Sequence, residues 1–346
     1  MQIGNRLVGP GQPAFIIAEM SANHGHDLER AVQIVKAAKE AGADAIKLQT
    51  YTPDTITFRS DAEPFRIGGG TLWDGRALHE LYADAFTPWE WHFKLKQVAD
   101  ELGLLLFSTP FDFTAVDFLE SLDVPAYKIA SAELVDIPLL RRVARTGKPL
   151  IISTGMATLA EIDEAVRTVR AAGATQVALL RTNSAYPAPP DEMDLRTIPH
   201  LAETFGVPVG LSDHTLELAV PVAAVAVGAA IIEKHLTLSR DLGGPDSAFS
   251  LEPHEFKDMV RAVRTAEKAL GGIRYGPTAH EKAGLPFRRS LFVVQDIKAG
   301  EEFTHANVRS IRPAHGLHPR HLDDVVGRRA TQDLKAGTPL GWEHVG

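Results

Sequence analysis

The sequence predicts an α/β protein built on a (β/α)₈ TIM barrel, followed by a small β-rich domain. Short apolar runs alternate with longer amphipathic segments along residues 1–272. Continuous apolar strands are typical of a parallel sheet that is buried on both faces. Eight such strand–helix pairs match the size of one barrel. A doubly wound sheet is the alternative, but polar residues end nearly every strand, which favours the barrel.

The expected strands are bounded by turn residues, and the segments between them have helical periodicity. Residues 27–42 begin with the capping residue Asp27 and end at Gly42. Residues 158–173 begin with a Thr-Leu-Ala-Glu capping box and also end at a glycine. The eight expected strands are 15–20, 45–50, 104–110, 126–131, 149–155, 177–183, 207–214 and 229–236.

The pattern changes after residue 272. Residues 273–285 are rich in glycine, proline and charge, and we interpret them as a linker. Residues 286–346 read as short strands and turns; within them DIKAGEEFT (296–304) and DLKAGTPLG (333–341) resemble each other, which predicts an internal pseudo-repeat. Residues 51–87 form an unusually long connection, of a kind that often serves as an active-site lid.

Composition excludes several classes of function. The 346 residues carry a net charge of −8 and no basic tract, which argues against a nucleic-acid partner. The absence of cysteine excludes disulfides, cysteine nucleophiles and thiolate metal sites. No apolar run approaches the ~20 residues that span a bilayer, and the amino-terminal residues lack a signal-peptide pattern. We therefore expect a cytoplasmic protein with small-molecule substrates and no membrane partner.

Two consecutive strands end in histidines, His214 and His235. Catalytic residues of a barrel lie at the carboxyl ends of its strands. Because neighbouring strands lie ~4.8 Å apart, the two imidazoles could share one metal ion, with oxygens as further ligands. Each histidine could equally be a hydrogen-bonded strand-end residue, and the residues alone leave both interpretations open.

Lys47 and Lys128 also end apolar strands. A buried ammonium group needs an anionic partner. The two lysines suit a ligand that carries a phosphate and a carboxylate, together with the hydroxyl groups of Thr109, Ser131, Ser153 and Ser212. Two alternatives stay open: a structural ion pair with Glu19 or Glu133, or Lys128 as the nucleophile of a Schiff-base aldolase.

Two further residues have more than one interpretation. Glu19 could be a general base, with a raised pKa if apolar atoms surround it, or a partner that orients another group. Phe111 could form one wall of a sugar pocket or pack within the fold.

Several motifs resemble the sialic acid synthase family, and they occur in order from about residue 2 to residue 345. These motifs are NHGHDLERA, IKLQTY, FSTPFD, YKIASAEL, ISTGMAT, GLSDHT, EKHLTLSRDLGGPDSAFSLEP and IRPAHGLHP. Within the family, the pseudaminic acid branch is the most similar, through GGTLWDGRALHELY, SAYPAP, FRRSLFVVQDIKAGE and ATQDLKAGTPLGWE.

The resemblance implies an enzyme that condenses phosphoenolpyruvate with an N-acetylated amino sugar and water, and releases phosphate. For the pseudaminic acid branch the sugar is 2,4-diacetamido-2,4,6-trideoxy-L-altrose. The neuraminate and legionaminate branches, with other sugars, are alternatives with the same chemistry. The resemblance also implies an antifreeze-like (SAF, β-clip) domain after the barrel. It implies a domain-swapped homodimer in which each small domain covers the other subunit's barrel mouth.

The resemblance further implies site residues, matched position by position. A divalent metal, Mn²⁺ ahead of Mg²⁺ or Co²⁺, would be held by His214 and His235. Proton transfer would fall to Glu19 and Glu133. Phosphoenolpyruvate would be bound by Lys47, Thr109, Lys128, Ser131, Ser153 and Ser212. The sugar would be contacted by Gln49, Tyr186, Asp246 and Arg312, the last of these supplied by the other subunit.

The sequence departs from the neuraminate branch at Ser184, where those enzymes usually carry asparagine. A serine suits the pseudaminic acid branch, and we expect the amide of Asn183 to replace part of the missing contact. Protonation of a ligand histidine near pH 6.5, unless its pKa is shifted, is expected to depress activity.

Overall fold

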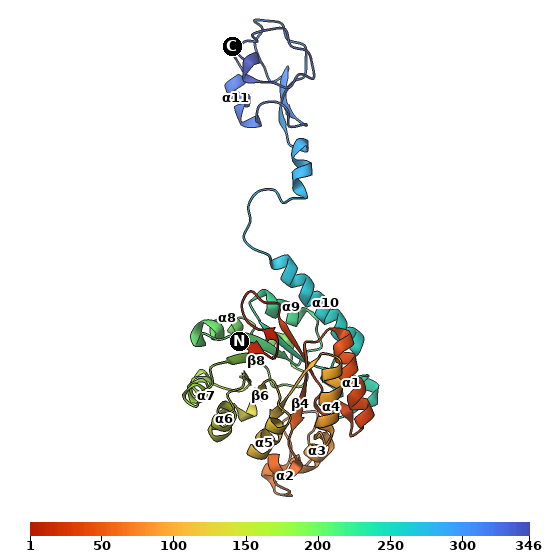
Figure 1. The fold of residues 1–346 in the computed structure, drawn as a ribbon. Helices are drawn as coiled ribbons and strands as arrows, with labels where there is room; N and C mark the ends of the chain where they lie inside the picture. The colour runs from red at the N-terminus through yellow and green to blue at the C-terminus, as the bar shows by residue number, and fades with distance from the viewer. The chain divides into compact units, whose positions relative to one another are not determined.

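The computed structural model describes all residues from Met1 to Gly346, in two compact units, Met1–Gly271 and Gly272–Gly346. The first unit is a closed barrel of eight parallel strands surrounded by helices (Figure 1), which confirms the predicted barrel and excludes the doubly wound sheet. The barrel strands are β3 (Phe15–Glu19), β4 (Ala45–Thr50), β5 (Leu105–Pro110), β6 (Tyr127–Ile129), β7 (Leu150–Ser153), β8 (Val177–Thr182), β9 (Val209–Asp213) and β10 (Ile231–His235).

The helices around the barrel begin and end at the predicted signals. The Asp27 side chain accepts hydrogen bonds from the backbone of Glu29 and Arg30, and Thr158 and Glu161 form the expected capping box. Most of these helices bury one apolar face against the sheet. They are α1 (Leu28–Ala41), α4 (Trp91–Glu101), α5 (Phe113–Ser121), α6 (Ile137–Ala144), α7 (Leu159–Ala171), α8 (Thr197–Phe205), α9 (Ala219–Ala226) and α10 (Pro253–Leu270).

The long connection 51–87 is not a structureless loop. It contains two short helices and one 3₁₀ turn, and an antiparallel bridge between Arg66 and Ala77 closes its central part. Its elements are α2 (Pro53–Ile56), η2 (Glu63–Phe65) and α3 (Leu78–Ala85). These elements are too short and too irregular in pattern for their periodicity to stand out in the sequence.

Other short elements cap or connect the barrel strands. The β1 and β2 strands form a small antiparallel pair before the barrel. None of the helices combines the length and apolar character that a bilayer crossing requires. The short elements are β1 (Gln2–Ile3), β2 (Arg6–Leu7), η1 (Ser21–His24), η3 (Ala132–Val135), η4 (Pro190–Glu192), η5 (Arg240–Leu242) and η6 (Ser247–Phe249).

The second unit has its own small apolar core, which includes Leu291, Phe303 and Val308. The predicted linker, 273–285, and the β-rich segment, 286–346, both lie within this unit. Its elements are η7 (Glu281–Phe287), β11 (Ser290–Val293), β12 (Val308–Ile311), η8 (Pro319–His321), α11 (Leu322–Val325) and η9 (Trp342–His344), with β11 and β12 antiparallel.

The pseudo-repeat of the second unit is confirmed as a reciprocal pairing of its two copies. Lys335 Nζ lies 2.6 Å from Asp296, and Lys298 Nζ lies 2.7 Å from Asp333. Each aspartate also accepts a hydrogen bond of 2.9 Å from a backbone amide of the other copy. The two similar sequences therefore occupy equivalent places around one local centre.

Gly210 allows the last two barrel strands to pair closely. A Cβ atom at this position would collide with the carbonyl oxygen of Ile231 on β10. A strand backbone cannot move aside as a flexible side chain can. The glycine is therefore required for the approach of β9 to β10, the two strands that end near His214 and His235.

We predict that Gly210→Ala lowers the free energy of unfolding by at least about 3 kcal/mol, the upper range for overpacked sites. Gly272→Ala is the matched control, because a Cβ atom there has no neighbour within 4 Å. Urea denaturation followed by circular dichroism measures both. A Gly210→Ala protein as stable as the control would show that the strands tolerate a wider spacing.

Candidate active site

A cavity of about 530 Å³ opens among the residues that follow the carboxyl ends of the barrel strands. This is the place where a barrel positions its chemistry, because every strand delivers a loop there. Half-buried and buried side chains from nearly all the connections contribute to its wall. The predicted site residues that line it are Gln49, Phe111, Ser131, Glu133, Ser184, Tyr186, His235 and Asp246.

Four ionisable side chains meet beneath this cavity, inside the barrel. Lys47 Nζ lies 2.7 Å from Glu19 Oε2 and 3.6 Å from Glu233 Oε1. Lys128 Nζ lies 3.5 Å from the same oxygen of Glu233. The ion pair with Glu19 that the sequence left open is therefore present, whereas Glu133 makes no such pair. Glu233 was not among the predicted site residues, although it stands two positions before His235 on one strand and so shares its face.

Burial and mutual attraction shift these four groups in different directions. Burial raises the pKa of Glu19 to about 7, against the opposing effect of Lys47. Burial lowers the pKa of Lys128 to about 8. Burial opposes the shift of Glu233, but the two lysines hold its pKa below the usual value. Burial also opposes the shift of Lys47, but Glu19 and Glu233 hold the pKa of this lysine above its usual value. Whenever Glu19 is protonated, the cluster carries net positive charge and attracts an anion.

The hydroxyl groups of Ser131 and Ser184 lie over the backbone of Gly155. Ser131 Oγ accepts a hydrogen bond of 3.1 Å from the Gly155 amide. Ser153 Oγ and Ser184 Oγ are buried without a partner. A Cβ atom on Gly155 would collide with Ser184 Oγ and lie 2.7 Å from Ser131 Oγ. The unpaired hydroxyls are therefore available to a ligand, in a space that only glycine leaves open.

The remaining predicted hydroxyl groups belong to the charge cluster itself. Thr109 Oγ1 accepts a hydrogen bond of 3.3 Å from Lys47 Nζ. Ser212 Oγ donates to Glu233 Oε1 at 3.1 Å. Both residues are buried, so they orient the charged groups rather than line the open cavity.

The two histidines lie together, with ring centroids 5.3 Å apart. His214 Nδ1 is 2.7 Å from the carbonyl oxygen of Asn183, so Nδ1 carries the proton and Nε2 keeps a free lone pair. His235 Nδ1 is buried and has no hydrogen-bond partner. Burial lowers the pKa of His214 to about 4 and that of His235 well below its ordinary value. Both are therefore neutral at pH 7, and protonation near pH 6.5 is not what the structure supports.

This histidine pair fits a divalent metal that takes oxygens as its other ligands. Neutral imidazole is the metal-binding form, and a carbonyl behind the ring orients it as in known metal sites. The chain gathers no group of three or more histidine, cysteine or acidic side chains that could hold a metal. Further ligands would therefore be water or substrate, as in catalytic sites with open positions.

Aromatic and acidic residues surround the histidines on the cavity side. Tyr186 stacks 4.4 Å from His214, and Phe249 lies 4.9 Å from both His235 and Tyr186. Asp246 is half-buried and accepts hydrogen bonds from the Ser21 hydroxyl and, at 3.2 Å, from the Ala22 amide. Phe249 was missed from the sequence, because nothing in its local pattern distinguishes a pocket wall from packing.

One expected sugar contact, the Asn183 side chain, has other partners, and another, Arg312, lies in the second unit. The Asn183 side chain binds the Ala185 amide and Glu192, so its amide does not replace the contact at Ser184 as expected. Asn183 instead contributes its carbonyl to His214. Arg312 is exposed and belongs to the second unit, where it follows β12.

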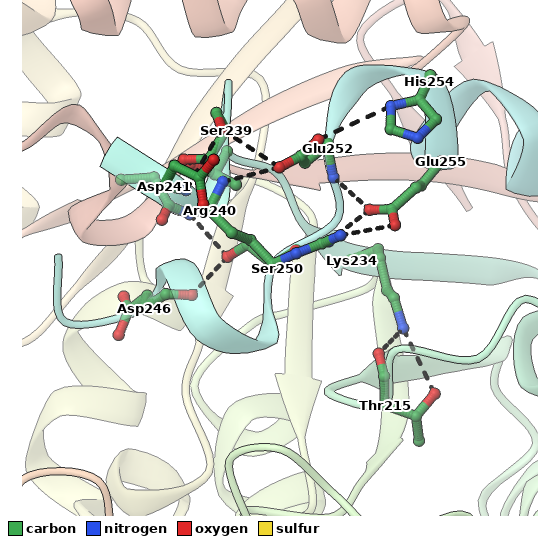
Figure 2. A network of polar contacts seen from close by, with 12 residues as sticks. Thr215, Lys234, Ser239, Arg240, Asp241, Asp246, Ser250, Glu252, His254 and Glu255 are labelled. Carbon is green, nitrogen blue, oxygen red and sulfur yellow. Dashed lines mark hydrogen bonds and ion pairs between the residues drawn. The ribbon is translucent and has the colours of Figure 1, made fainter. Parts of the chain in front are cut away.

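An ion pair on the outer face of the barrel braces the two histidine strands. Lys234 Nζ lies 2.6 Å from Asp213 Oδ2, and it also donates to Thr215 (Figure 2), with both charged side chains fully buried. Side chains alternate along a strand, so Lys234 points outward while Glu233 and His235 point inward. This pair therefore links the residues that precede His214 and His235.

Comparison with known proteins agrees with this geometry. The model described as "NeuB family" matches residues 34–275, and the "SAF domain" model matches residues 288–346. The chain belongs to the NeuB family. The resemblance expected from the motifs is thereby confirmed, and so is the SAF domain that was expected to follow the barrel.

Named relatives of this NeuB-family chain cover nearly its whole length. Pseudaminic acid synthase of Helicobacter pylori is 46% identical, over 96% of this chain and 98% of that protein. N,N'-diacetyllegionaminic acid synthase of Legionella pneumophila is 38% identical, over 97% and 96%. The crystal structure of N-acetylneuraminic acid synthetase from Leptospira borgpetersenii, in complex with citrate, has a TM-score of 0.73 and 32% identity, over 82% of this chain and 94% of that one.

We predict that Lys234→Met lowers the free energy of unfolding by about 3–5 kcal/mol, because Asp213 is left buried and uncompensated. Asp213→Asn in addition should recover most of the loss, since the amide oxygen still accepts from the Thr215 backbone. Lys335→Met, which removes an exposed ion pair, is the control and should change stability little. Equal effects of the two lysine changes would show that the buried pair has no structural role.

Proposed function

We propose that this chain is a pseudaminic acid synthase. It condenses phosphoenolpyruvate with 2,4-diacetamido-2,4,6-trideoxy-L-altrose and water, and it releases pseudaminic acid and phosphate. The observation that carries this proposal is one cavity with two unlike halves. Two buried lysines lie inside the barrel beneath it, the hydroxyls of Ser131 and Ser184 line it, and an apolar wall surrounds its mouth. The higher identity to a pseudaminic acid synthase than to a legionaminic acid synthase supports the choice of sugar.

The outer half of the cavity suits a sugar with few hydroxyl groups. A trideoxy sugar with two acetamido groups presents three methyl groups, which pack favourably on apolar walls. N-acetylmannosamine carries more hydroxyl groups, which such walls would leave unpaired. The apolar and aromatic residues that line this half are Tyr51, Ile56, Ile67, Trp73, Leu78, Leu81, Tyr82, Phe111, Met156, Tyr186 and Phe249.

The floor of the cavity suits the two anionic groups of phosphoenolpyruvate. Lys47 and Lys128 are charge partners for the phosphate and the carboxylate, which would compete with Glu19 and Glu233 for the same ammonium groups. The hydroxyls of the Gly155 region complete the hydrogen bonds to the anion. Because water is largely excluded there, these fixed donors act more strongly than they would in solution.

His214 and His235 would hold a divalent metal, which we propose is Mn²⁺ and which when bound polarises the sugar aldehyde as a Lewis acid. Carbon 3 of phosphoenolpyruvate attacks the aldehyde carbon, and carbon 2 becomes cationic. Glu133, on the cavity wall, donates a proton to the aldehyde oxygen as it becomes a hydroxyl group. Glu19 takes a proton from the water that adds to carbon 2. The tetrahedral intermediate then loses phosphate by C–O cleavage. Its C2 hydroxyl becomes the keto group and passes its proton to the departing phosphate, which both lysines hold.

We also propose that two copies form a domain-swapped homodimer in the cytoplasm, with each SAF domain, and its Arg312, over the other copy's cavity. Large apolar side chains on several barrel-mouth loops are exposed, which supports a covering partner. These residues are Phe58, Leu72, Val135, Met156, Leu216 and Leu242. Sedimentation velocity tests this proposal, and a monomer at micromolar concentration would contradict it.

One observation favours a second candidate, a Schiff-base aldolase. The pKa of Lys128, lowered to about 8 by burial, would make its amine nucleophilic. Borohydride treatment with pyruvate traps such an enzyme as a stable adduct detectable by mass spectrometry. The synthase proposal expects no adduct on Lys128.

The proposed function is tested by phosphate release from phosphoenolpyruvate with Mn²⁺ and each of three sugars. These are the altrose-configured diacetamido sugar, its mannose-configured counterpart and N-acetylmannosamine. Turnover that is confined to the altrose sugar and abolished by a chelator is expected. Turnover mainly with N-acetylmannosamine would contradict the sugar assignment, and turnover that persists in excess chelator would contradict the metal.

We predict that Gly155→Ala raises the KM for phosphoenolpyruvate at least about tenfold, because the new methyl group occupies the space between the hydroxyls and displaces hydrogen bonds to a charged ligand. Gly284→Ala, in the second unit with no neighbour near its Cβ position, is the control. Steady-state kinetics at saturating sugar measures the effect. An unchanged KM for phosphoenolpyruvate would place the anion elsewhere.

We predict that kcat/KM falls with rising pH as Glu133 loses its proton. Burial raises its pKa to about 7, so it is protonated below that pH and loses its proton above it. A group that must donate a proton then causes kcat/KM to fall as the pH rises through about 7. Glu133→Gln should lower kcat about 10²-fold and remove this limb.

The control for this pH profile is Glu161→Gln, which changes an exposed capping residue on α7 and should leave both the rate and the limb intact. A limb near pH 7 that persists in Glu133→Gln would assign the titration to another group.

A further inference from the structure

We infer that Trp73 is a positioning residue that closes the sugar half of the cavity and limits which sugars fit. Its indole latches the segment 66–77 onto the backbone of the β10–α10 connection. The inference rests on the proposed function for the identity of the sugar, but the latch itself is a structural claim. No predicted site residue lies in this segment, although the length of the connection 51–87 marked it as a candidate lid.

The indole of Trp73 is the shared wall of two cavities. Its Nε1 donates a hydrogen bond of 3.0 Å to the carbonyl oxygen of Pro245, and its ring lies 5.6 Å from that of Tyr186. Trp73 and Pro245 line the reaction cavity, and they also line a neighbouring cavity of about 610 Å³ that is bordered by His26 and Arg76. Removing the indole would join the two spaces.

The acceptor side of the latch is held rigidly (Figure 2). Arg240 pairs with Glu255 on α10 at 2.8 Å and donates to the Ser250 carbonyl at 3.1 Å. Ser250 Oγ in turn donates to the Asp246 carbonyl at 2.6 Å. The backbone around Pro245 is therefore tied to the first turn of α10, and the carbonyl that Trp73 binds has a fixed position.

On the Trp73 side, residues 70–74 form an ordered turn, here called the tip, which follows the glycines 68–70. Asp74 accepts hydrogen bonds from the amides of Gly70 and Thr71, each at 2.8 Å, which orders the tip. Behind the tip runs Gly68-Gly69-Gly70, where a Cβ atom would meet no neighbour within 4 Å. Gly69 and Gly70 have φ angles of 102° and 85°, which side chains disfavour. Backbone hydrogen bonds of 2.9 Å from Ile67 to Arg76 and 2.8 Å from Gly75 to Ile67 close the base of the tip. The tip is therefore one unit, and Trp73 fastens it to the carbonyl of Pro245.

The latch lies beside the proposed sugar contacts and not beside the proposed phosphoenolpyruvate contacts. Trp73 contacts Tyr186, which covers His214, and binds the residue before Asp246, and both neighbours are proposed sugar contacts. Lys47 and Lys128 form their ion pairs inside the barrel, and neither lysine lines the cavity that Trp73 lines. Loss of the latch should therefore weaken the sugar and leave phosphoenolpyruvate nearly unaffected.

Two variants divide the role of Trp73 into its parts. Trp73→Phe keeps a ring but loses the donor, and Trp73→Ala loses both. We expect the KM for the sugar to rise about fivefold in the first, as for one lost hydrogen bond, and by more than about tenfold in the second. The KM for phosphoenolpyruvate should stay within about twofold, because Trp73 shares no partner with the lysines. In Trp73→Ala, the preference for the altrose sugar over N-acetylmannosamine should shrink, because the outer cavity becomes accessible.

Hydrogen exchange tests the latch without reference to any substrate. Backbone amides of residues 66–77 should exchange faster in both variants than in the wild-type chain, and those of 239–252 should not. Trp342→Phe, in the second unit, is the control for loss of a tryptophan. Unchanged exchange at 66–77 would overturn the latch, and parallel rises in both KM values would overturn its assignment to the sugar. If the wild-type chain turns over none of the three sugars, the proposed function fails while the exchange result still decides the latch.

Discussion

The structure depends on one constraint, which is the burial of two ammonium groups, Lys47 and Lys128, inside the barrel. An ammonium group in a protein interior costs several kcal/mol unless anions offset it. Glu19 and Glu233 offset it here at 2.7–3.6 Å. These carboxylates share the ammonium groups that an anionic substrate needs, so the site is stable without substrate and still attractive to it. The raised pKa of Glu19 fits this arrangement, because a carboxylate with a raised pKa is a stronger base for the proton of the attacking water once the anion has taken its lysine.

Strand alternation distributes the remaining roles around this cluster. On β10, Glu233 and His235 point inward, to the charges and to the proposed metal, while Lys234 points outward and is neutralised by Asp213. Glu233, Lys234 and His235 are consecutive, yet each contacts a different set of groups because of this alternation. The apolar upper wall comes from connections rather than strands, which separates the binding of the sugar from the binding of the anion. Changes in the connections can therefore alter sugar preference while the floor stays constant.

The sequence predicted the parts of this structure that local patterns encode. Apolar runs located all eight strands, and Asp27 and the Thr158 capping box located helix starts, because these signals act over a few residues. The gathering of His214 and His235 could be predicted because both end neighbouring strands. The role of Glu233 could not, since the partner of each lysine is decided by barrel closure across β4, β6 and β10. The Asn183 side chain was expected at the sugar, but the fold engages it with Ala185 and Glu192, which are brought beside it by the loop after β8. The short helices of the connection 51–87 were not predicted, because their packing onto the barrel mouth leaves no periodic pattern in the sequence.

The most direct test of the central claim is a crystal structure of the full chain with phosphoenolpyruvate and Mn²⁺. The account predicts phosphoenolpyruvate between Lys47 and Lys128, with the Lys47–Glu19 contact lengthened from 2.7 Å to beyond ion-pair distance. It also predicts hydrogen bonds from Ser153 and Ser184 to the anion, and the metal on His214 and His235. Phosphoenolpyruvate bound away from both lysines, with the Glu19 and Glu233 ion pairs intact, would contradict it.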